Sequence, residues 1–245
     1  MQDFFANCAT VLQKYGFSYL RGAGTTLLLA LVGTFFGCLI GFAVGALQTI
    51  PIDKQRDPVW KRVLLKILHI FLRCYVELFR GTPMIVQAVF IYYGLLQVFG
   101  IKMGMWQAGF FIVSINTGAY MAETVRGGIV SIDPGQTEGA KAIGMTHVQT
   151  MTSVILPQAF RNILPQVGNN FIINIKDTSV MFVIGFVEFF GVHRNIVGNN
   201  YMYFQSAAIE MLGYLTMTLV FSFVLRRVER LLAGPSSAFS HRRSR

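Results

Sequence analysis

The sequence predicts an all-α membrane protein with five transmembrane helices. Of its 245 residues, 53% are hydrophobic and only 13% are charged, which is far more apolar than the composition of soluble domains. The apolar residues gather in long stretches, and about 20 of them in a row are enough to cross the hydrocarbon core as a helix. We therefore expect residues 1–245 to form a single transmembrane domain.

The first span is expected at residues 20–50, because no charge occurs from Gly22 to Ile50. Glycine recurs at every fourth position within it. Small residues at this spacing allow two helices to approach closely, so the pattern predicts a helix contact on this face. The glycines are Gly33, Gly37, Gly41 and Gly45.

The second span, residues 64–98, divides into a charged half and an apolar half. The stretch from Gly81 to Ile101 carries no charge. We expect the charged half to lie along the cytoplasmic surface of the membrane and the apolar half to cross it. The chain should bend at residues 81–83, because proline interrupts a helix. The charges of the first half are Lys66, Arg73, Glu77 and Arg80.

The other spans are expected at residues 103–126, 164–190 and 203–230, with a polar loop at 131–161 between the third and the fourth. Polar residues interrupt the fourth span.

The three cysteines lack the spacing of a metal site or a disulfide framework, so we expect small core residues and no metal. They are Cys8, Cys38 and Cys74.

The formal net charge of +10 sets the expected orientation. One basic cluster lies between the first two spans, and a second follows the last span. Short loops rich in Lys and Arg stay in the cytoplasm, so we expect the N-terminus outside and the C-terminus inside. Nucleic-acid binding explains the clusters less well, because it requires one water-exposed basic face. The clusters are Lys54, Arg56, Lys61, Arg62 and Lys66, and Arg226, Arg227, Arg230, Arg242, Arg243 and Arg245.

The same orientation places the loop between the third and fourth spans in the cytoplasm. Pro134 suits the first turn of a helix, and Gly144 suits a helix end. We expect a helix over 136–143, a glycine corner, and a second helix over 146–155 that ends near Pro157. The residues alone leave open whether this loop is a docking knob or an ordinary connector.

The stretch EGAKAIGMTHVQTMTSVILP, residues 138–157, resembles the cytoplasmic signature of ABC importer permeases. That signature runs Glu-Ala-Ala, three residues, Gly, nine residues, Ile, one residue, Leu-Pro. Gly139 and Val154 depart from it, and a glycine costs a helix about 1 kcal/mol relative to alanine. The resemblance implies a coupling helix that docks on an ATPase. Its expected contacts are Glu138, Gly139, Ala140, Gly144, Met145, Leu156 and Pro157.

Three other segments are similar to the polar amino acid branch of this family, the histidine, glutamine and arginine type. They are ELFRGTPMIVQAVFIYYG (77–94), AYMAETVRGGIVSIDPGQ (119–136) and NNFIINIKDTSVMFVIG (169–185). The resemblance covers most of the chain from the first span to the fifth. It implies the type I ABC importer permease fold, with a five-span core and a cytoplasmic coupling helix.

The resemblance also implies the partners. A permease of this family sits in the bacterial cytoplasmic (inner) membrane beside a second permease subunit, which is the same or a different chain. An ABC ATPase dimer lies below the pair, and an external solute-binding protein delivers the amino acid. The sequence has no GxxxxGK followed by Ser or Thr, the phosphate-binding motif of ATPases. The chain is therefore not expected to be an enzyme, and ATP and Mg are expected on the partner ATPase.

Two other classes of function were open to a chain with several spans. A secondary transporter of small polar solutes, driven by ion binding, commonly carries inverted repeats, and none is evident here. A structural scaffold would leave the loop and the polar fourth span without a purpose. The preferred hypothesis is the permease subunit of an ATP-driven amino acid importer.

Polar residues inside the spans are candidates for the substrate path, because polar groups in hydrocarbon are costly. Amide side chains can donate and accept hydrogen bonds, as a zwitterionic amino acid requires. Bonds between helices explain the same residues equally well, so both interpretations stay open. The candidates are Gln87, Asn116, Tyr120, Asn170, Asn174, Asp177 and Ser179.

Four charges nearer the cytoplasmic face are expected to form ion pairs between spans. Such pairs can act as a static brace or as a gate between two arrangements. The brace is favoured, because a charge in the membrane must first be neutralised. The four are Glu77, Arg80, Glu123 and Arg126.

The orientation can be tested with reporters at the two ends of the chain. A reporter fused after Arg245 should report the cytoplasm, and a tag before Met1 should be accessible from outside, because the basic clusters hold their loops inside. Both ends on the same side would eliminate the five-span arrangement, since an odd number of crossings separates them.

Overall fold

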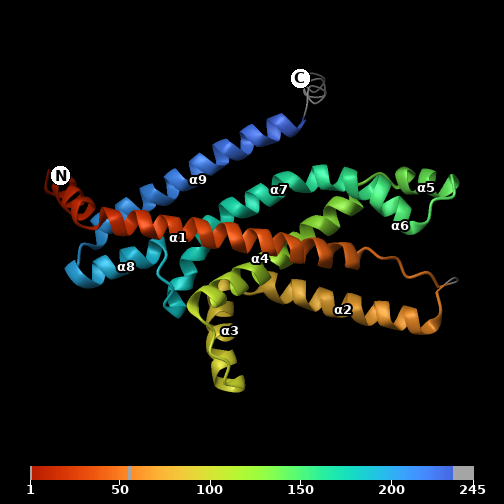
Figure 1. Ribbon diagram of the computed structural model, residues 1–245, viewed down its shortest axis with the longest axis horizontal. Coiled ribbons are helices and arrows are strands. Elements are labelled where there is room, and N and C mark those ends of the chain that lie inside the picture. The colour runs from red at the N-terminus through yellow and green to blue at the C-terminus, as the bar shows by residue number, and fades with distance from the viewer. Residues whose placement is uncertain (1, 55–56, 234–245) are drawn as a thin grey trace.

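The computed structural model describes residues 2–54 and 57–233, and every regular element in these ranges is helical (Figure 1). The all-α prediction is confirmed. The elements are α1 (Gln2–Gln48), α2 (Val59–Gly81), α3 (Met84–Phe99), α4 (Met105–Val130), α5 (Pro134–Ala142), α6 (His147–Thr150), a π-helical turn (Met151–Ile155), α7 (Leu156–Asp177), a 3-10 helix (Thr178–Ile184), α8 (Phe189–Asn200) and α9 (Tyr203–Ala233).

The centre of the bundle is a parallel contact between α1 and α4. The glycine row of α1 lies directly against α4, as the sequence predicted. A Cβ atom built on Gly41 would lie 2.3 Å from the Cβ of Met121 and 2.9 Å from the backbone nitrogen of Ala122. Gly33 and Gly37 face Val113 and Thr117 in the same way. The residue numbers of the contacting pairs increase together along α1 and α4, so the two helices run in the same direction.

Helix α2 runs antiparallel beside α1 and α4 (Figure 1). Leu72 and Val76 pack against Val44 of α1 and Ala122 of α4. Helix α3 then turns away, at 114° to α2. The chain bends at residues 81–83, as expected, and α2, the charged half of the expected span 64–98, is the part that follows the long helices. Apart from Lys61 in its first turn, the charged residues of α2 share one side of the helix, and the other sides are apolar.

The α5–α6 segment leads into α7 without a break. The helix ending expected near Pro157 is wrong, because the chain passes through a π-helical turn over Met151–Ile155 and continues as α7. The helix can continue through this proline, which is the second residue of α7. Its missing N–H falls where the change from π-helix to α-helix already interrupts the regular backbone bonds. Helix α7 then runs antiparallel to α4 and contains Pro165 in its interior.

Helices α8 and α9 complete the bundle at the end where α1 begins. Val11 and Tyr19 of α1 form an apolar cluster with Phe189, Val192 and Ile196 of α8. Helix α1 therefore extends well before the expected start at residue 20. Helix α9 runs antiparallel to α7, so its last described residues lie toward the end that carries α5 and α6 (Figure 1).

Two helices, α1 and α9, are each long and apolar enough to cross a membrane. Two bent pairs meet the same standard if each is taken as one broken span: α2 with α3, and the helical run from α6 to residue 184 with α8. Helix α4, the expected third span, is more polar. It lies at the centre of the bundle, where Ser114, Asn116 and Thr117 are buried, whereas Glu123 and Arg126 lie on a partly exposed side.

The described residues of the two basic clusters lie toward the end of the bundle that carries α5 and α6. Lys61 is hydrogen-bonded at 2.5 Å to Asp57, just before α2, and this contact lowers the pKa of the Asp57 carboxyl. Arg226, Arg227 and Arg230 lie in the last turns of α9. Arg56, Arg242, Arg243 and Arg245 lie outside the described residues.

The α1–α4 contact predicts a difference between two glycines of α1. Gly41→Ala should destabilise the protein by about 1–3 kcal/mol, the usual cost of overpacking, because its Cβ would meet backbone atoms of α4. Gly24→Ala is the matched control, since no atom lies within 4 Å of its Cβ position. Thermal unfolding in detergent measures both. Equal midpoints would contradict the proposed tight contact.

Candidate functional site

The segment from α5 to α6 forms a compact knob at one end of the bundle, built from local bonds. The Asp133 side chain caps α5 by accepting from the backbone N–H of Gly135 at 2.6 Å. Gly144 then turns the chain with a φ of 81°, a conformation that favours glycine. Thr146 and Gln149 cap α6 reciprocally. These bonds hold residues 133–150 in one shape. We call this segment the α5–α6 knob.

The outer surface of the α5–α6 knob is apolar around the glycine corner. Ile143 is 79% exposed and Val148 is 69% exposed. Glu138 and Gly139 are exposed as well, and the Glu138 side chain has no partner among the described residues. Such apolar exposure on a small capped segment marks a contact surface.

The predicted coupling residues do not all lie on that surface. Ala140 is buried, at 6% exposure, and its carbonyl accepts from the N–H of Met145 at 3.0 Å. Ala140 therefore faces the inside of the knob in this structure, in contrast to the outward contact that the sequence suggested. Leu156 packs into the apolar cluster around Met121 and Ile163. Pro157 is exposed at the start of α7.

Two of the candidate path residues hold the α2–α3 bend. The Gln87 amide donates at 2.9 Å to the carbonyls of Phe79 and Thr82, just before the bend. Asn116 of α4 donates to the Gln87 side-chain oxygen at 2.9 Å and to the Phe79 carbonyl at 3.3 Å. Both side chains are buried. In this conformation both amides donate to the Phe79 carbonyl, whose usual helical donor four residues later is replaced by Pro83.

Asn174 joins three helices. Its amide donates to Thr34 of α1 at 2.8 Å and to Thr117 of α4 at 2.9 Å. It is 4% exposed, so the interhelical interpretation accounts for it fully here. Asn170, one turn earlier, is half-buried and donates to the Gln166 carbonyl at 3.0 Å.

The remaining path candidates lie apart from these bonds. Tyr120 of α4 is 43% exposed, and Asp177 at the end of α7 is also exposed. Ser179 is half-buried in the 3-10 helix. The candidates thus fall into buried connectors, which are Gln87, Asn116 and Asn174, and groups at or near the surface of this single chain.

Three of the four predicted charges come together on α2 and α4. Arg126 contacts Glu123 at 2.5 Å within α4, and Arg80 of α2 approaches the same carboxylate at 4.0 Å. The Arg80 guanidinium also lies over the Tyr120 ring, 5.8 Å from its centroid. Glu77 is exposed and has no partner among the described residues. The Arg80 contact links α2 to α4, whereas the Arg126 contact lies within α4.

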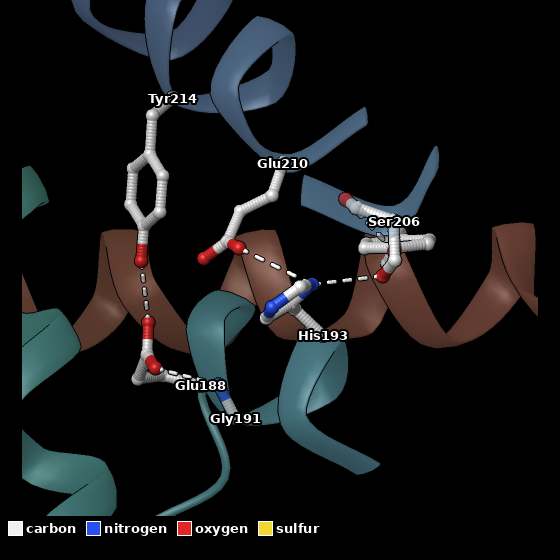
Figure 2. A network of polar contacts seen from close by, with 7 residues as sticks. Glu188, Gly191, His193, Ser206, Glu210 and Tyr214 are labelled. Atoms are coloured by element: carbon white, nitrogen blue, oxygen red, sulfur yellow. Dashed lines mark hydrogen bonds and ion pairs between the residues drawn. The ribbon is translucent and has the colours of Figure 1, made fainter. Parts of the chain in front are cut away.

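A buried polar network at the opposite end of the bundle was not predicted (Figure 2). Glu188 has no exposed surface. Its carboxylate accepts from Thr26 of α1 at 3.0 Å, from Tyr214 of α9 at 2.8 Å, and from the Gly191 N–H of α8 at 2.9 Å. One carboxylate therefore ties α1, α8 and α9 together.

A second carboxylate lies in the same network. Glu210 of α9 approaches Nδ1 of His193 at 3.5 Å, and that nitrogen is 2.9 Å from the Ser206 hydroxyl. Ser206 is in turn 2.6 Å from the Tyr19 hydroxyl. Figure 2 shows His193 of α8 pointing toward Ser206 and Glu210 of α9. The signal available in the sequence was a lone Glu in each of two apolar stretches, because intramembrane carboxylates mark sites that need partners.

The structure also has a cavity of about 570 Å³ beside this network. It lies between the first half of α1, the start of α4 and α8, and Arg21, Trp106, Phe186, Asn195 and Asn199 are among its lining residues. None of the predicted path residues lines it. No group of three or more His, Cys, Asp or Glu side chains in residues 2–54 and 57–233 could hold a metal ion.

The Glu188 network predicts the effect of removing one hydroxyl. Tyr214→Phe should destabilise the protein by about 1–2 kcal/mol, because it removes a buried hydrogen bond to a carboxylate. Tyr203→Phe, on the same helix but 58% exposed, is the matched control and should change little. Thermal unfolding in detergent compares them. A larger loss for the exposed tyrosine would refute the network's stabilising role.

Residues 60–234 match the family profile described as binding-protein-dependent transport system inner membrane component. The chain is 36% identical over 212 residues to the glutamine transport system permease protein GlnP of Escherichia coli (strain K12), covering 86% of this chain and 91% of that protein. It is 31% identical to the arginine transport system permease protein ArtQ of Bacillus subtilis (strain 168), covering 87% and 91%.

Solved structures agree with the sequence matches. One, described as the crystal structure of an amino acid ABC transporter with histidines, superposes with a TM-score of 0.79 at 36% identity, covering 90% of this chain and 97% of that chain. An inward-facing form of the MetNI methionine ABC transporter superposes with a TM-score of 0.70 at 22% identity, covering 86% and 94%. The second match supports the fold alone.

Proposed function

This chain belongs to the family of binding-protein-dependent transport system inner membrane components, and from that membership we propose how its parts contribute to import. It is the permease subunit of an ATP-driven amino acid importer and has the type I ABC importer permease fold. ATP hydrolysis is carried by a separate subunit, so the chain is not an enzyme. The competing hypothesis of an ion-driven secondary transporter has no support from these relatives.

The observation that carries the proposal is the α5–α6 knob. Its apolar surface at Ile143 and Val148 is exposed to water if the knob is cytoplasmic, and burying that surface against a partner would be favourable. Glu138 on the same segment is free to engage a donor group of the partner. The knob is the coupling helix that docks on the ATPase, and ATP and Mg bind to that partner.

The knob can transmit a movement because both of its ends continue into the bundle. Helix α5 follows α4 after a short turn, and α6 passes through the π-helical turn into α7. Asn174 of α7 is bonded to α1 and α4. A displacement of the knob therefore moves α4 and α7 together, with α1 attached to both.

The wider assembly follows from family membership. The protein is a multi-pass protein of the inner membrane and works with an ATPase, a second permease subunit and a solute-binding protein. We place its N-terminus outside and its C-terminus in the cytoplasm. The ATPase works as a dimer, the second permease subunit is the same or a different chain, and the binding protein delivers an amino acid from outside.

The charged cluster of Arg80, Glu123 and Arg126 is assigned a bracing role in this conformation. Its side chains are between 34% and 42% exposed in the single chain, so water screens the pairs and each contributes little by itself. Exposed Tyr120 lies beside them on α4. This surface is the part of the substrate path that faces the second permease subunit.

The coupling role predicts different effects for two neighbouring glycines. Gly144→Val should weaken ATPase association about tenfold, because a β-branched residue at a φ of 81° is strained by about 1–3 kcal/mol. Gly139→Ala is the control, since no atom lies within 4 Å of its Cβ position. Copurification of the ATPase and ATP-driven uptake in vesicles provide the measurements.

Cross-linking tests the contact directly. In a cysteine-free background, Ile143→Cys should cross-link to the ATPase, whereas Ala140→Cys, which is buried, should not. Glu138→Lys should uncouple ATP hydrolysis from uptake. If Gly144→Val transports normally and no exposed knob position cross-links, the loop is a plain connector.

A further inference from the structure

We propose that one side of α2 forms a positively charged, water-facing wall along the cytoplasmic half of the substrate path, which attracts the carboxylate of the solute. This inference rests on the proposed function and names the chemical group of the substrate that the path handles. The wall, which we call the α2 stripe, consists of Arg62, Lys66, His69, Arg73, Glu77 and Arg80.

The α2 stripe is a continuous feature of one helix side. Its members follow Arg62 by 4, 7, 11, 15 and 18 residues, and at 3.6 residues per turn these positions fall within a sector of about 80° and extend over about 27 Å. On one side of this sector lies the packed face with Leu72 and Val76. On the other lies an exposed apolar face that includes Ile67, Phe71 and Leu78.

The depth of the stripe follows from its contacts with neighbouring helices. His69 lies 3.1 Å from the carbonyl of Leu47 at the end of α1. The carbonyl of Phe79 accepts from Asn116, which lies near the middle of the 26-residue helix α4. The stripe therefore extends from the end of the bundle that carries the α5–α6 knob to about half its length.

A charge at that depth cannot face hydrocarbon, so the stripe must face protein or water. Arg80 gives the direction, because it contacts Tyr120 and Glu123 on the uncovered side of α4. Lys66 and Arg73 are exposed, and neither has a partner among the described residues. The apolar face with Phe71 faces lipid, and the α2 stripe faces the aqueous path shared with the second permease subunit.

The charge of the stripe fits a carboxylate. Four cations, Arg62, Lys66, Arg73 and Arg80, oppose a single carboxylate, Glu77. A cleft lined by one sign of charge raises the local concentration of the opposite charge. Every free amino acid carries a carboxylate, so this wall attracts that group whatever the side chain, and the unpaired Lys66 and Arg73 are its available cations.

The natural cysteine of α2 provides a matched pair of probes for this wall. Cys74 is exposed on the apolar side of the helix, next to Arg73. Two proteins are compared, each with Cys8→Ala and Cys38→Ala. One retains Cys74, and the other carries Cys74→Ala with Arg73→Cys. A third places the probe at Lys66→Cys, also with Cys74→Ala.

The assembled complex in inside-out vesicles is treated with anionic sulfonatoethyl or cationic trimethylammonioethyl methanethiosulfonate. Cysteines at positions 66 and 73 should be labelled from water, and Cys74 should not. Each labelling rate at position 66 is divided by the rate of the same reagent with free cysteine. The ratio of the anionic to the cationic value should rise by about sevenfold for each kT of positive local potential. Arg73→Glu or Arg73→Gln should lower that ratio and reduce amino acid uptake.

The outcomes separate the wall from the importer function. Absence of labelling at positions 66 and 73, or equal labelling of Cys74, overturns the water-facing wall. Equal rates for the two reagents overturn its positive character. If the cysteines at positions 66 and 73 are protected from labelling only when anionic lipid is present, the stripe binds lipid headgroups, and the proposal is also overturned. ATP-driven uptake and ATPase copurification are measured on the same vesicles, so either idea can fail while the other survives.

Discussion

The close parallel contact between α1 and α4 is the constraint on which the rest of the structure depends. Side chains longer than hydrogen at Gly33, Gly37, Gly41 and Gly45 would push the two helices apart. Because they touch at backbone distance, α2 and α7 can each pack against both, while α8 packs against α1. Without a hydrophobic driving force between helices in lipid, such close packing is a main source of attraction.

Buried polar groups then fix the positions of the surrounding helices. Asn174 sets α7 against the α1–α4 pair, the Gln87 and Asn116 amides hold the α2–α3 bend, and Glu188 ties α8 and α9 to α1. Each of these groups would be costly without its partners in an apolar surrounding. These bonds therefore hold α7, the α2–α3 bend, α8 and α9 in place around α1 and α4.

These two kinds of contact connect the ends of the molecule. The α5–α6 knob is joined to α4 and α7, which are bonded to α1, and α1 extends to the Glu188 network at the far end. The exposed charges of α2 and α4 lie between, on a side that this single chain leaves uncovered. The chain thus combines close packing in its interior with charged groups on an uncovered side.

The sequence by itself determined the helical class, the glycine face of α1, the bend after Gly81 and the capped knob with its corner at Gly144. All of these depend on local composition or spacing, which a single stretch of chain contains. The tertiary structure decided which polar residues are connectors, that Ala140 faces inward, that α2 rather than α3 follows the long helices, and that Glu188 meets Thr26 and Tyr214. These outcomes depend on which helix supplies the facing atoms, and residues 26, 188 and 214 become neighbours only when the bundle closes.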